Sequence, residues 1–442
     1  MSGLSRRSML RGAAGAGLGL LAAPALTACG SASADAVTEG PVRLSLWTHD
    51  PGYIKTFQRA VGDRSLMRGS RFDYRMRFTN AAGSDVVTRM IAQAVADGNT
   101  PDLAGVIIDQ FPRVMGSSIA ENLFVDLSET VRPYGNTLLK LAPYSVGSTP
   151  YGLDSDNSVS VLYYRQDVFA EHGVPEDTET WQELARHGKR LYDRHRISLG
   201  MVSTGDNGSI VNGFLQFLLQ RGGEVFDVDG NLTLDSAEAV ETLDFMARGV
   251  QSGFLMSLPD PYGGSCAAAL KSGRLAATVM PNWYKVYGLE ANVPEQKGKW
   301  RIRTLPRFAK GGHLASTLGG TAFCVLKDKP HTEAALELLR RVYLTREGQL
   351  LRYRSGGFLP TLSTLYEDAE LRAITDDYLG GQRVFDVYGE AVADLPTFYQ
   401  AQGMQILTDA LGGTILRALQ GRTSAAAALN DGIEAYRQQF KR

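Results

Sequence analysis

The sequence has little cysteine and no excess of charge of either sign. Three cysteines occur among 442 residues, which is too few for a disulfide scaffold. Lys and Arg number 46 against 47 Asp and Glu, so the formal net charge is -1. A protein that binds nucleic acid needs surplus cations to displace the counterions of the phosphates. The charge balance therefore argues against a nucleic-acid partner.

Long hydrophobic runs are also missing. The longest apolar stretch, Gly12 to Leu26, is shorter than the roughly 20 residues that span a bilayer. It follows the segment Ser5–Arg11, which contains a twin arginine. A charged start followed by a short apolar run is typical of an export signal that is removed from the mature protein. The sequence thus predicts a signal peptide over residues 1–28 and no permanent membrane span there.

Two short motifs refine this prediction. Ser5–Arg11 resembles a twin-arginine export signal, although Met9 replaces the usual Phe, so general export stays open. Leu26–Cys29 resembles the lipobox of bacterial lipoproteins. That resemblance implies cleavage before Cys29 and attachment of an acylated glycerol to its sulfur. We therefore expect an extracytoplasmic protein held at the cell membrane by its N-terminal lipid, followed by a flexible, polar tether over residues 29–41.

The other two cysteines, Cys266 and Cys324, lie in apolar surroundings. Such surroundings favour buried free thiols. An oxidising compartment would also permit a bridge between them, so both alternatives remain open.

The motifs of metal and cofactor sites are absent from the sequence. The six histidines show no paired metal-ligand spacing, and HExxH, G-x-S-x-G and P-loop motifs do not occur. We therefore expect neither a metal nor a cofactor. An enzyme is not excluded on this ground, because the carboxylate pairs of glycosidases leave no local signature.

The periodicity of the mature chain predicts an α/β protein. Apolar residues alternate from Val42 to Leu46, which is the period of a strand. An apolar helical face follows over residues 84–95, and the apolar run 103–108 fits a buried parallel strand. This order of strand, helix and strand begins a doubly wound sheet. Trp181, which begins a predicted helix, and Trp300 are assigned to packing.

Seven segments in a fixed order provide a more specific signal. They are residues 94–108, 161–184, 222–234, 269–284, 318–325, 327–348 and 356–361. Together they resemble family 1 extracellular solute-binding proteins of ABC importers, the sugar-binding group that includes maltose-binding protein. Arg165 departs from the pattern, since the family usually has Asn there.

The resemblance implies a two-lobed periplasmic-binding-protein fold of type II, with a ligand cleft between hinged lobes. By analogy the N-lobe comprises residues 42–128 and 306–350, and the C-lobe residues 129–305 and 351–442. Ligand binding would close the hinge, because only the closed form lets both lobes touch the solute. We expect a monomer whose closed form is recognised by the membrane permease of an ABC importer.

A receptor for sugars needs aromatic platforms and side chains that fork between hydroxyl groups. Trp47 ends the first predicted strand, where clefts of open α/β sheets form, and His49 and Asp50 follow it. The resemblance implies that Asp109 and Gln110, just after the second strand, are a polar pair that binds the ligand.

The resemblance also implies that Trp283 stacks on the ligand, with Tyr284 beside it. Residues with weaker signals lie in segments expected to face the cleft: Asn157, Asn207, Asn212, Arg354 and Tyr399. Asp154 and Asp156 are interpreted as turn formers. Gly319 and Gly320 are expected to let the backbone approach the cleft.

Two functional hypotheses follow. The first is a lipid-anchored binding protein that delivers a carbohydrate, with an oligosaccharide favoured, and performs no chemistry. The alternative is a secreted carbohydrate-active lipoprotein enzyme, a glycosidase or lyase, that uses Asp109 and a second cleft carboxylate. A sensory or scaffold lipoprotein that has kept the fold would bind no solute.

Overall fold

The computed structural model describes residues 36–96 and 98–440. The expected signal peptide, Cys29 and the first part of the tether lie outside the described residues. The last part of the expected tether belongs to the folded unit, since β1 begins at Gly40 and the Val37 amide donates to the Pro330 carbonyl at 2.8 Å. Within the described residues, every helix is too short or too polar to cross a membrane.

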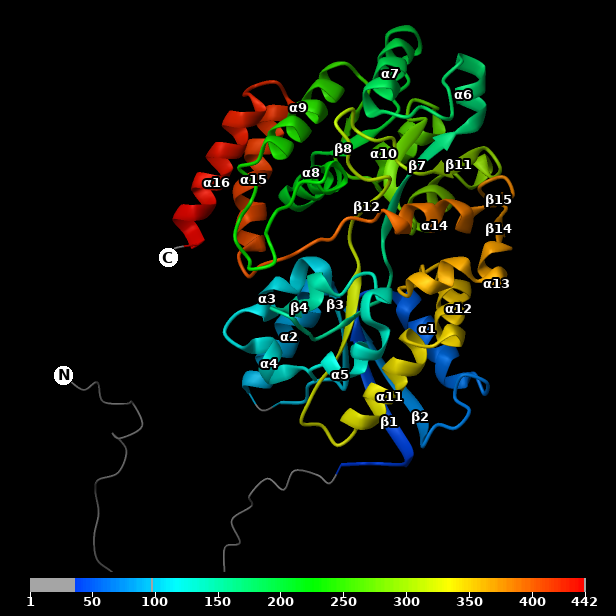
Figure 1. Cartoon of the computed structure of the whole chain (residues 1–442), viewed down its shortest axis with the longest axis vertical. Coiled ribbons are helices and arrows are strands. Elements are labelled where there is room, and N and C mark those ends of the chain that lie inside the picture. The colour runs from blue at the N-terminus through cyan, green and yellow to red at the C-terminus, as the bar shows by residue number, and fades with distance from the viewer. Residues whose placement is uncertain (1–35, 97, 441–442) are drawn as a thin grey trace, which may run out of the picture. The chain divides into compact units, whose positions relative to one another are not determined.

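The first sheet has five strands (Figure 1). The strands predicted over residues 42–46 and 103–108 and the helix predicted over residues 84–95 are present, but a helix over residues 51–62 and a strand over residues 72–80, which were not predicted, lie between them in the chain. In spatial order they are β2 (Phe72–Asn80), β1 (Gly40–Thr48), β3 (Leu103–Ile107), β13 (Thr321–Val325) and β6 (Leu153–Asp154). β1 pairs in parallel with β2 and β3, whereas β13 is antiparallel to β3 and β6. We call the elements built on this sheet the first lobe.

Helices and short turns cover the first sheet (Figure 1). The α-helices are α1 (Pro51–Gly62), α2 (Gly83–Val95), α3 (Pro112–Met115), α4 (Ile119–Leu123), α5 (Ser128–Val131), α11 (Thr332–Tyr343) and α12 (Arg346–Gly356). The 3₁₀ turns are η1 (Ile108–Gln110), η2 (Arg132–Thr137) and η3 (Ala142–Tyr144), and β4 (Ser145–Val146) pairs with β5 (Thr149–Pro150).

The second sheet is built around β7 (Val159–Arg165), and we call its elements the second lobe. β10 (Ala277–Pro281), β11 (Trp300–Arg303) and β12 (Ser316–Thr317) all pair with it in the antiparallel sense. All seven residues of β7 are buried, as expected for a strand covered on both faces. A smaller parallel pair joins β8 (Met201–Ser203) to β9 (Met256–Leu258).

The helices of the second lobe surround these strands. They are α6 (Gln166–His172), α7 (Trp181–His195), α8 (Asn207–Arg221), α9 (Ala237–Gln251), α10 (Gly264–Lys271), α14 (Val384–Ala393), α15 (Met404–Leu419) and α16 (Ala425–Phe440). Smaller elements are the π-helix η4 (Lys285–Glu290), η5 (Pro294–Gln296), η6 (Ser363–Glu367), α13 (Ala369–Arg372) and the pair β14 (Thr375–Asp376) and β15 (Gln382–Arg383).

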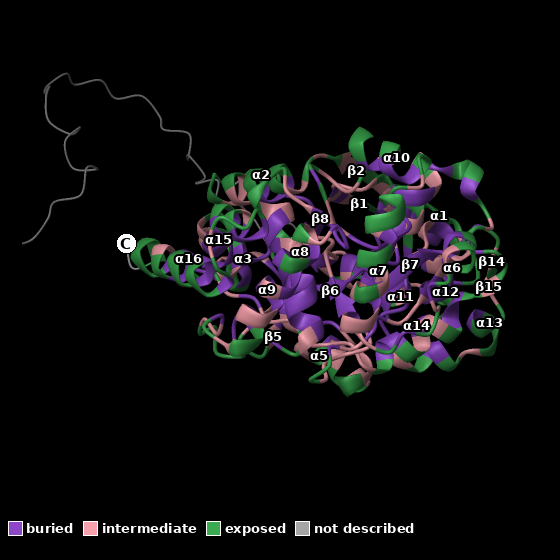
Figure 2. Cartoon of the chain, turned by 90° about the horizontal axis from the view of Figure 1, so that it is seen from above, coloured by how far each residue is buried: buried purple, intermediate pink, exposed green. Residues whose placement is uncertain are grey.

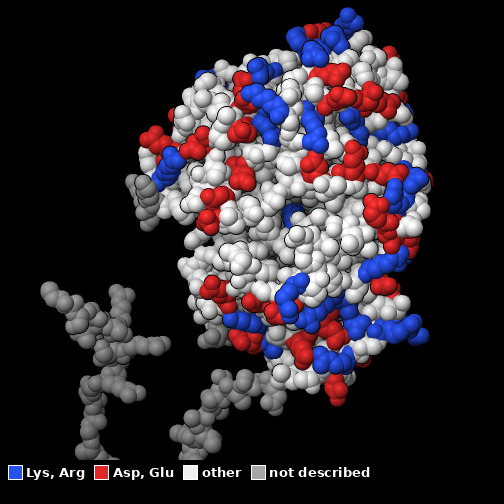
Figure 3. All heavy atoms as spheres, viewed as in Figure 1, with Lys and Arg blue, Asp and Glu red and all other residues white. Residues whose placement is uncertain are grey.

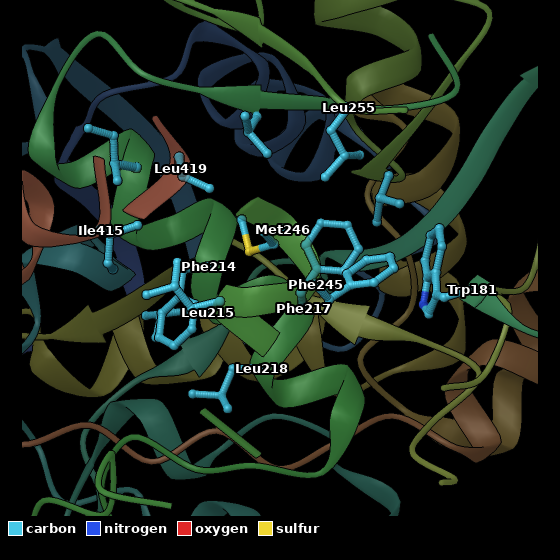
Figure 4. Close-up of a cluster of buried hydrophobic side chains, with 14 of the residues drawn as sticks. Trp181, Phe214, Leu215, Phe217, Leu218, Phe245, Met246, Leu255, Ile415 and Leu419 are labelled. Carbon is cyan, nitrogen blue, oxygen red and sulfur yellow. The ribbon is translucent and has the colours of Figure 1, made fainter. Parts of the chain in front are cut away.

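Large apolar side chains fill the second lobe. Trp181 begins α7 and packs against the aromatic residues Phe217 and Phe245 (Figure 4). Its indole nitrogen donates to the Gln220 side chain at 2.7 Å, and the fully buried Trp300 bonds Gln296 in the same way. Both tryptophans therefore serve packing, as predicted. Figure 2 shows buried residues through the interior, whereas α16 alternates between buried and exposed positions.

Cys266 and Cys324 are buried free thiols in two separate apolar clusters. Cys266 belongs to the second lobe and Cys324, on β13, to the first. The structure therefore contains no bridge between them, and the free-thiol alternative is the one it shows.

The chain passes between the lobes at three connections. Residues 155–158 lead from β6 to β7, residues 318–320 from β12 to β13, and the segment after α12 leads back to the second lobe. The sequence placed residues 129–154 in the C-lobe and residues 306–350 in the N-lobe. Yet β6, within residues 129–154, pairs with β13 in the first sheet. β12, within residues 306–350, pairs with β7 in the second sheet. The strand pairing therefore differs from both predicted boundaries.

Candidate ligand-binding site

Two adjoining cavities lie between the lobes, each with a volume of about 330 Å³. Four residues line both cavities: Ile107, Tyr262, Trp283 and Gly319. Figure 3 shows charged side chains over both ends of one face of the molecule, with mostly uncharged atoms between them.

We call the first cavity the Asp50 compartment; it is also lined by His49, Tyr53, Asp156, Ser158, Tyr287 and Phe358. We call the second the Asp109 compartment; it is also lined by Met201, Ser209, Asn212, Gln216 and Pro261. Residues of both lobes line each compartment.

Strand ends position the central residues. Asp109 lies in η1, immediately after β3, and the Ile108 amide beside it donates to the Gly320 carbonyl at 3.0 Å. Trp283 follows β10, and Gly319 lies on the connection between β12 and β13. Asp109 thus lies at the carboxyl end of a first-lobe strand, Trp283 at the end of a second-lobe strand, and Gly319 on a connection between the lobes. Open α/β folds bind their ligands at the carboxyl ends of their strands.

Two aromatic side chains form the wall shared by the compartments. The rings of Tyr262 and Trp283 lie 6.0 Å apart between centroids, at an interplanar angle of 33°. Tyr262 is 40% exposed, and Trp283 is half-buried. Gly319 has a φ of +76°, and a Cβ there would lie 3.6 Å from the Trp283 indole. The glycine thus lets the backbone lie close to the ring in a conformation that other residues rarely adopt.

A hydrogen bond in the Asp50 compartment joins the two lobes. The Asp50 carboxylate accepts from the Gly52 amide at 2.7 Å, which caps α1, and from the Tyr287 hydroxyl at 2.9 Å. Tyr287 lies on η4 of the second lobe. The neighbouring His49 ring packs edge-on against Tyr53, and burial lowers its pKa against the opposing effect of Asp50. This burial favours the neutral imidazole of His49.

The Asp109 compartment contains a carboxylate that is open to the cavity. Protein atoms around it displace water, and this desolvation raises the pKa of Asp109, while the nearby Asn212 amide has the opposite effect. Asn212 comes from α8 of the second lobe. A carboxylate and an amide from opposite lobes can together accept and donate hydrogen bonds to neighbouring hydroxyl groups.

The structure brings five of the twelve residues proposed from the sequence into the compartments. They are His49, Asp50, Asp109, Asn212 and Trp283. The other seven line neither compartment.

Two of these seven lie close to the cleft. Trp47 packs against the apolar cluster that contains Val87 of α2. Gln110 accepts a hydrogen bond from the Arg113 guanidinium at 2.9 Å. Both side chains are thus engaged within the first lobe, and neither lines a compartment.

Asn157 and Tyr284 are fully buried. The Asn157 amide donates to the Pro360 carbonyl and to the Tyr366 hydroxyl, which ties two of the interlobe connections together. The Tyr284 hydroxyl donates to the Pro261 carbonyl at 3.0 Å. Neither side chain is accessible to a ligand in this structure, because hydrogen bonds within the protein hold both inside.

Asn207, Arg354 and Tyr399 lie farther away. Arg354 on α12 forms an ion pair with Glu370 beside a separate surface cavity. Asn207 begins α8 and lies against Gly412. Tyr399 lines no described cavity, although its neighbours Phe398 and Gln400 line a small one that also includes Asp109.

Several residues that line the compartments were not predicted from the sequence. Tyr262 and Tyr287 lie in a loop and a π-helix, which carry no local motif; the only hint is that Tyr287 follows Trp283 by four positions. Asp156 was interpreted as a turn former, but its buried carboxylate accepts from the Asn282 amide, the Ser158 amide and the Leu359 amide. Within residues 36–96 and 98–440, no cluster of three or more His, Cys, Asp or Glu could hold a metal.

Two α/β lobes, three crossing connections and a cavity lined from both sides define a two-lobed solute-binding protein. The family model described as bacterial extracellular solute-binding protein matches residues 73–349. The chain therefore belongs to the bacterial extracellular solute-binding protein family.

Relatives with known ligands share most of the chain. The arabinooligosaccharide-binding protein of Bacillus subtilis (strain 168) is 26% identical over 405 residues, which cover 87% of this chain and 89% of the relative. The lactose-binding protein of Rhizobium radiobacter is 24% identical, with 84% and 86% covered. The galacto-N-biose/lacto-N-biose I-binding protein of a Bifidobacterium longum ABC transporter has the same fold, with a TM-score of 0.72, 20% identity, and 91% and 98% covered.

Proposed function

We propose that the protein is the substrate-binding component of an ABC importer and captures an oligosaccharide between its lobes. The observation that carries this proposal is the pair of compartments on either side of the Tyr262–Trp283 wall. Aromatic faces suit the C–H faces of sugar rings, and the Asp109 carboxylate and Asn212 amide suit their hydroxyl groups. The names of the curated relatives support the same ligand class.

The size of the site favours more than one sugar ring. Ligand pockets commonly have volumes of roughly 300–1,000 Å³. The two compartments together lie within that range, since each measures about 330 Å³. We therefore place one ring of the oligosaccharide on each side of Trp283.

Closure of the lobes is the proposed mechanism of capture. Asp109 belongs to the first lobe and Asn212 to the second, so a ligand that contacts both favours the closed arrangement. The proposed hinge comprises residues 155–158, 318–320 and 357–360, where the strand pairing changes from one sheet to the other. A permease would then recognise the closed form.

Anchoring completes the proposal. We propose that the N-terminal segment is cleaved before Cys29 and that the acylated cysteine holds an extracytoplasmic monomer at the cell membrane. A chain with two acyl groups binds membranes stably, whereas one acyl group is marginal. Metabolic labelling with an alkyne fatty acid would detect the lipid on the wild-type protein and not on Cys29→Ser.

A ligand screen tests the function. The chain from residue 30 onward is heated with arabinotriose, lactose, maltotriose or glucose, and hits are measured by calorimetry. A specific ligand raises the melting temperature by mass action, and we expect an oligosaccharide to do so while remaining chemically unchanged. No shift with any sugar would contradict the proposal. New reducing ends after incubation would instead favour the carbohydrate-active enzyme, which the binding-protein relatives do not support.

A further inference from the structure

A buried pair of opposite charges lies directly beneath the site. Lys140 is 6% exposed and Asp154 is 3% exposed. The Lys140 ammonium donates to the Gly319 carbonyl at 2.8 Å and lies 4.0 Å from the Asp154 carboxylate. Lysine and aspartate are almost never this buried unless they are paired.

The pair packs against the backbone that lines the compartments. Gly320 has a φ of +123°, and a Cβ there would lie 2.8 Å from the Lys140 ammonium nitrogen and 2.8 Å from the Tyr144 hydroxyl. It would also lie 3.1 Å from an Asp154 carboxylate oxygen. A residue other than glycine would be strained at position 320, and the Gly319–Gly320 backbone lies close to both the charged pair and the Trp283 indole.

Stability alone does not account for this arrangement. Neither carboxylate oxygen of Asp154 has a hydrogen-bond partner among the described residues. Burial without such bonds is costly, and apolar residues often replace buried ion pairs with a gain in stability. The hydrogen bond from Lys140 to Gly319 connects the buried pair to the ligand site, because Gly319 lines both compartments.

We propose that Lys140 and Asp154 are positioning residues of the ligand site. The ammonium of Lys140 fixes the Gly319 carbonyl, and the Asp154 carboxylate holds that ammonium in place. These contacts hold the Gly319–Gly320 backbone against Trp283, and a ligand in either compartment would contact this backbone. The effect of this pair on ligand affinity rests on the proposed function, whereas its effect on the Gly319–Gly320 backbone can be measured in the ligand-free protein.

The pair should make binding sensitive to pH. Burial raises the pKa of Asp154 to about 7, an effect that Lys140 opposes and Asp156 adds to. The other titratable or charged groups that face Asp154 are Tyr144, Arg352, Tyr343 and Tyr366. Protonation of Asp154 removes the charge that holds the ammonium, so affinity should fall as the pH decreases from 8 to 6.

Hydrogen exchange in the ligand-free protein tests the positioning role. Lys140→Met removes the contact to Gly319, and Lys329→Met is a matched control, because Lys329 donates to the Thr100 carbonyl at the same 2.8 Å. We expect peptides that cover residues 105–110 and 316–322 to exchange about tenfold faster in the first variant only, a factor equal to about 1.4 kcal/mol of local opening. Equal exchange in both variants would overturn the proposal.

Calorimetry with arabinotriose, or with lactose if arabinotriose does not bind, tests the pH dependence. The wild type should bind about fivefold more tightly at pH 8 than at pH 6, and Asp154→Asn should show no such difference. An unchanged pH profile in Asp154→Asn would overturn the role of Asp154. If the wild type binds no sugar of the ligand screen, the proposed function is contradicted, while the exchange measurement still decides whether Lys140 positions the backbone.

Discussion

The two compartments contain similar residue types but use their carboxylates differently. In the Asp50 compartment, Asp50 and Asp156 already accept hydrogen bonds from protein groups, including the Tyr287 hydroxyl of the opposite lobe. In the Asp109 compartment, the Asp109 carboxylate is open to the cavity and has the Asn212 amide beside it. We infer that the first compartment holds the lobes together and that the second supplies polar contacts to the ligand.

The largest effect is expected at Asp109. Asp109→Ala should weaken oligosaccharide binding about 100-fold, which corresponds to about 2.7 kcal/mol, because a hydrogen bond to a charged group contributes roughly 1.5–3 kcal/mol. Calorimetry at pH 7.5 measures the loss. Asp50→Ala is the matched variant in the other compartment, and a larger loss there would reverse the comparison.

Removal of the shared wall should affect both compartments. Trp283→Ala should weaken affinity by more than tenfold, about 1.4 kcal/mol or more, because the ligand loses its stacking surface on each side. The melting temperature of the free protein should change little, since the side chain is only half-buried. Unchanged calorimetric affinity would remove Trp283 from the site.

The interlobe bond should have a smaller effect. Tyr287→Phe removes the hydroxyl that donates to Asp50, and we expect a three- to fivefold loss of affinity, in line with roughly 0.5–1.5 kcal/mol for one hydrogen bond. Small-angle scattering of the ligand-free variant should show a larger radius of gyration. If affinity and scattering both match the wild type, the bond does not favour closure.

The smallest effect is expected at Arg354, which lies outside both compartments. Arg354→Ala removes a surface ion pair with Glu370, and such pairs contribute less than about 1 kcal/mol to stability. Ligand affinity should stay within twofold of the wild type. A tenfold loss would show that the site extends to α12.

Local patterns in the sequence predicted β1, α2 and β3, but not α1 and β2, which lie between β1 and α2 in the chain. The alternation over residues 42–46 and the helical face over 84–95 correspond to β1 and α2. Asp109 and Trp283 were also named from the sequence, because both follow a strand and match the family pattern. These features depend on residues close together in the chain, which is why one sequence is enough to indicate them.

Side-chain direction was harder to predict than position. Trp283 and Tyr284 are neighbours, yet one lines both compartments and the other is fully buried. Successive residues at the start of a helical turn point about 100° apart, so only packing decides which of the two faces the cavity. Asn157 is a similar case, since the connection that contains it is buried between lobes.

The sequence by itself determined the α/β class, the elements β1, α2 and β3, the packing role of Trp181 and Trp300, and the family, because these depend on spacing along the chain. The tertiary structure decided which strand belongs to which sheet, and so brought Asp50 to Tyr287, Asp109 to Asn212 and Lys140 to Gly319. The partners in these pairs lie between 103 and 237 positions apart in the sequence. No local pattern encodes such distances, because they depend on where the chain crosses from one lobe to the other.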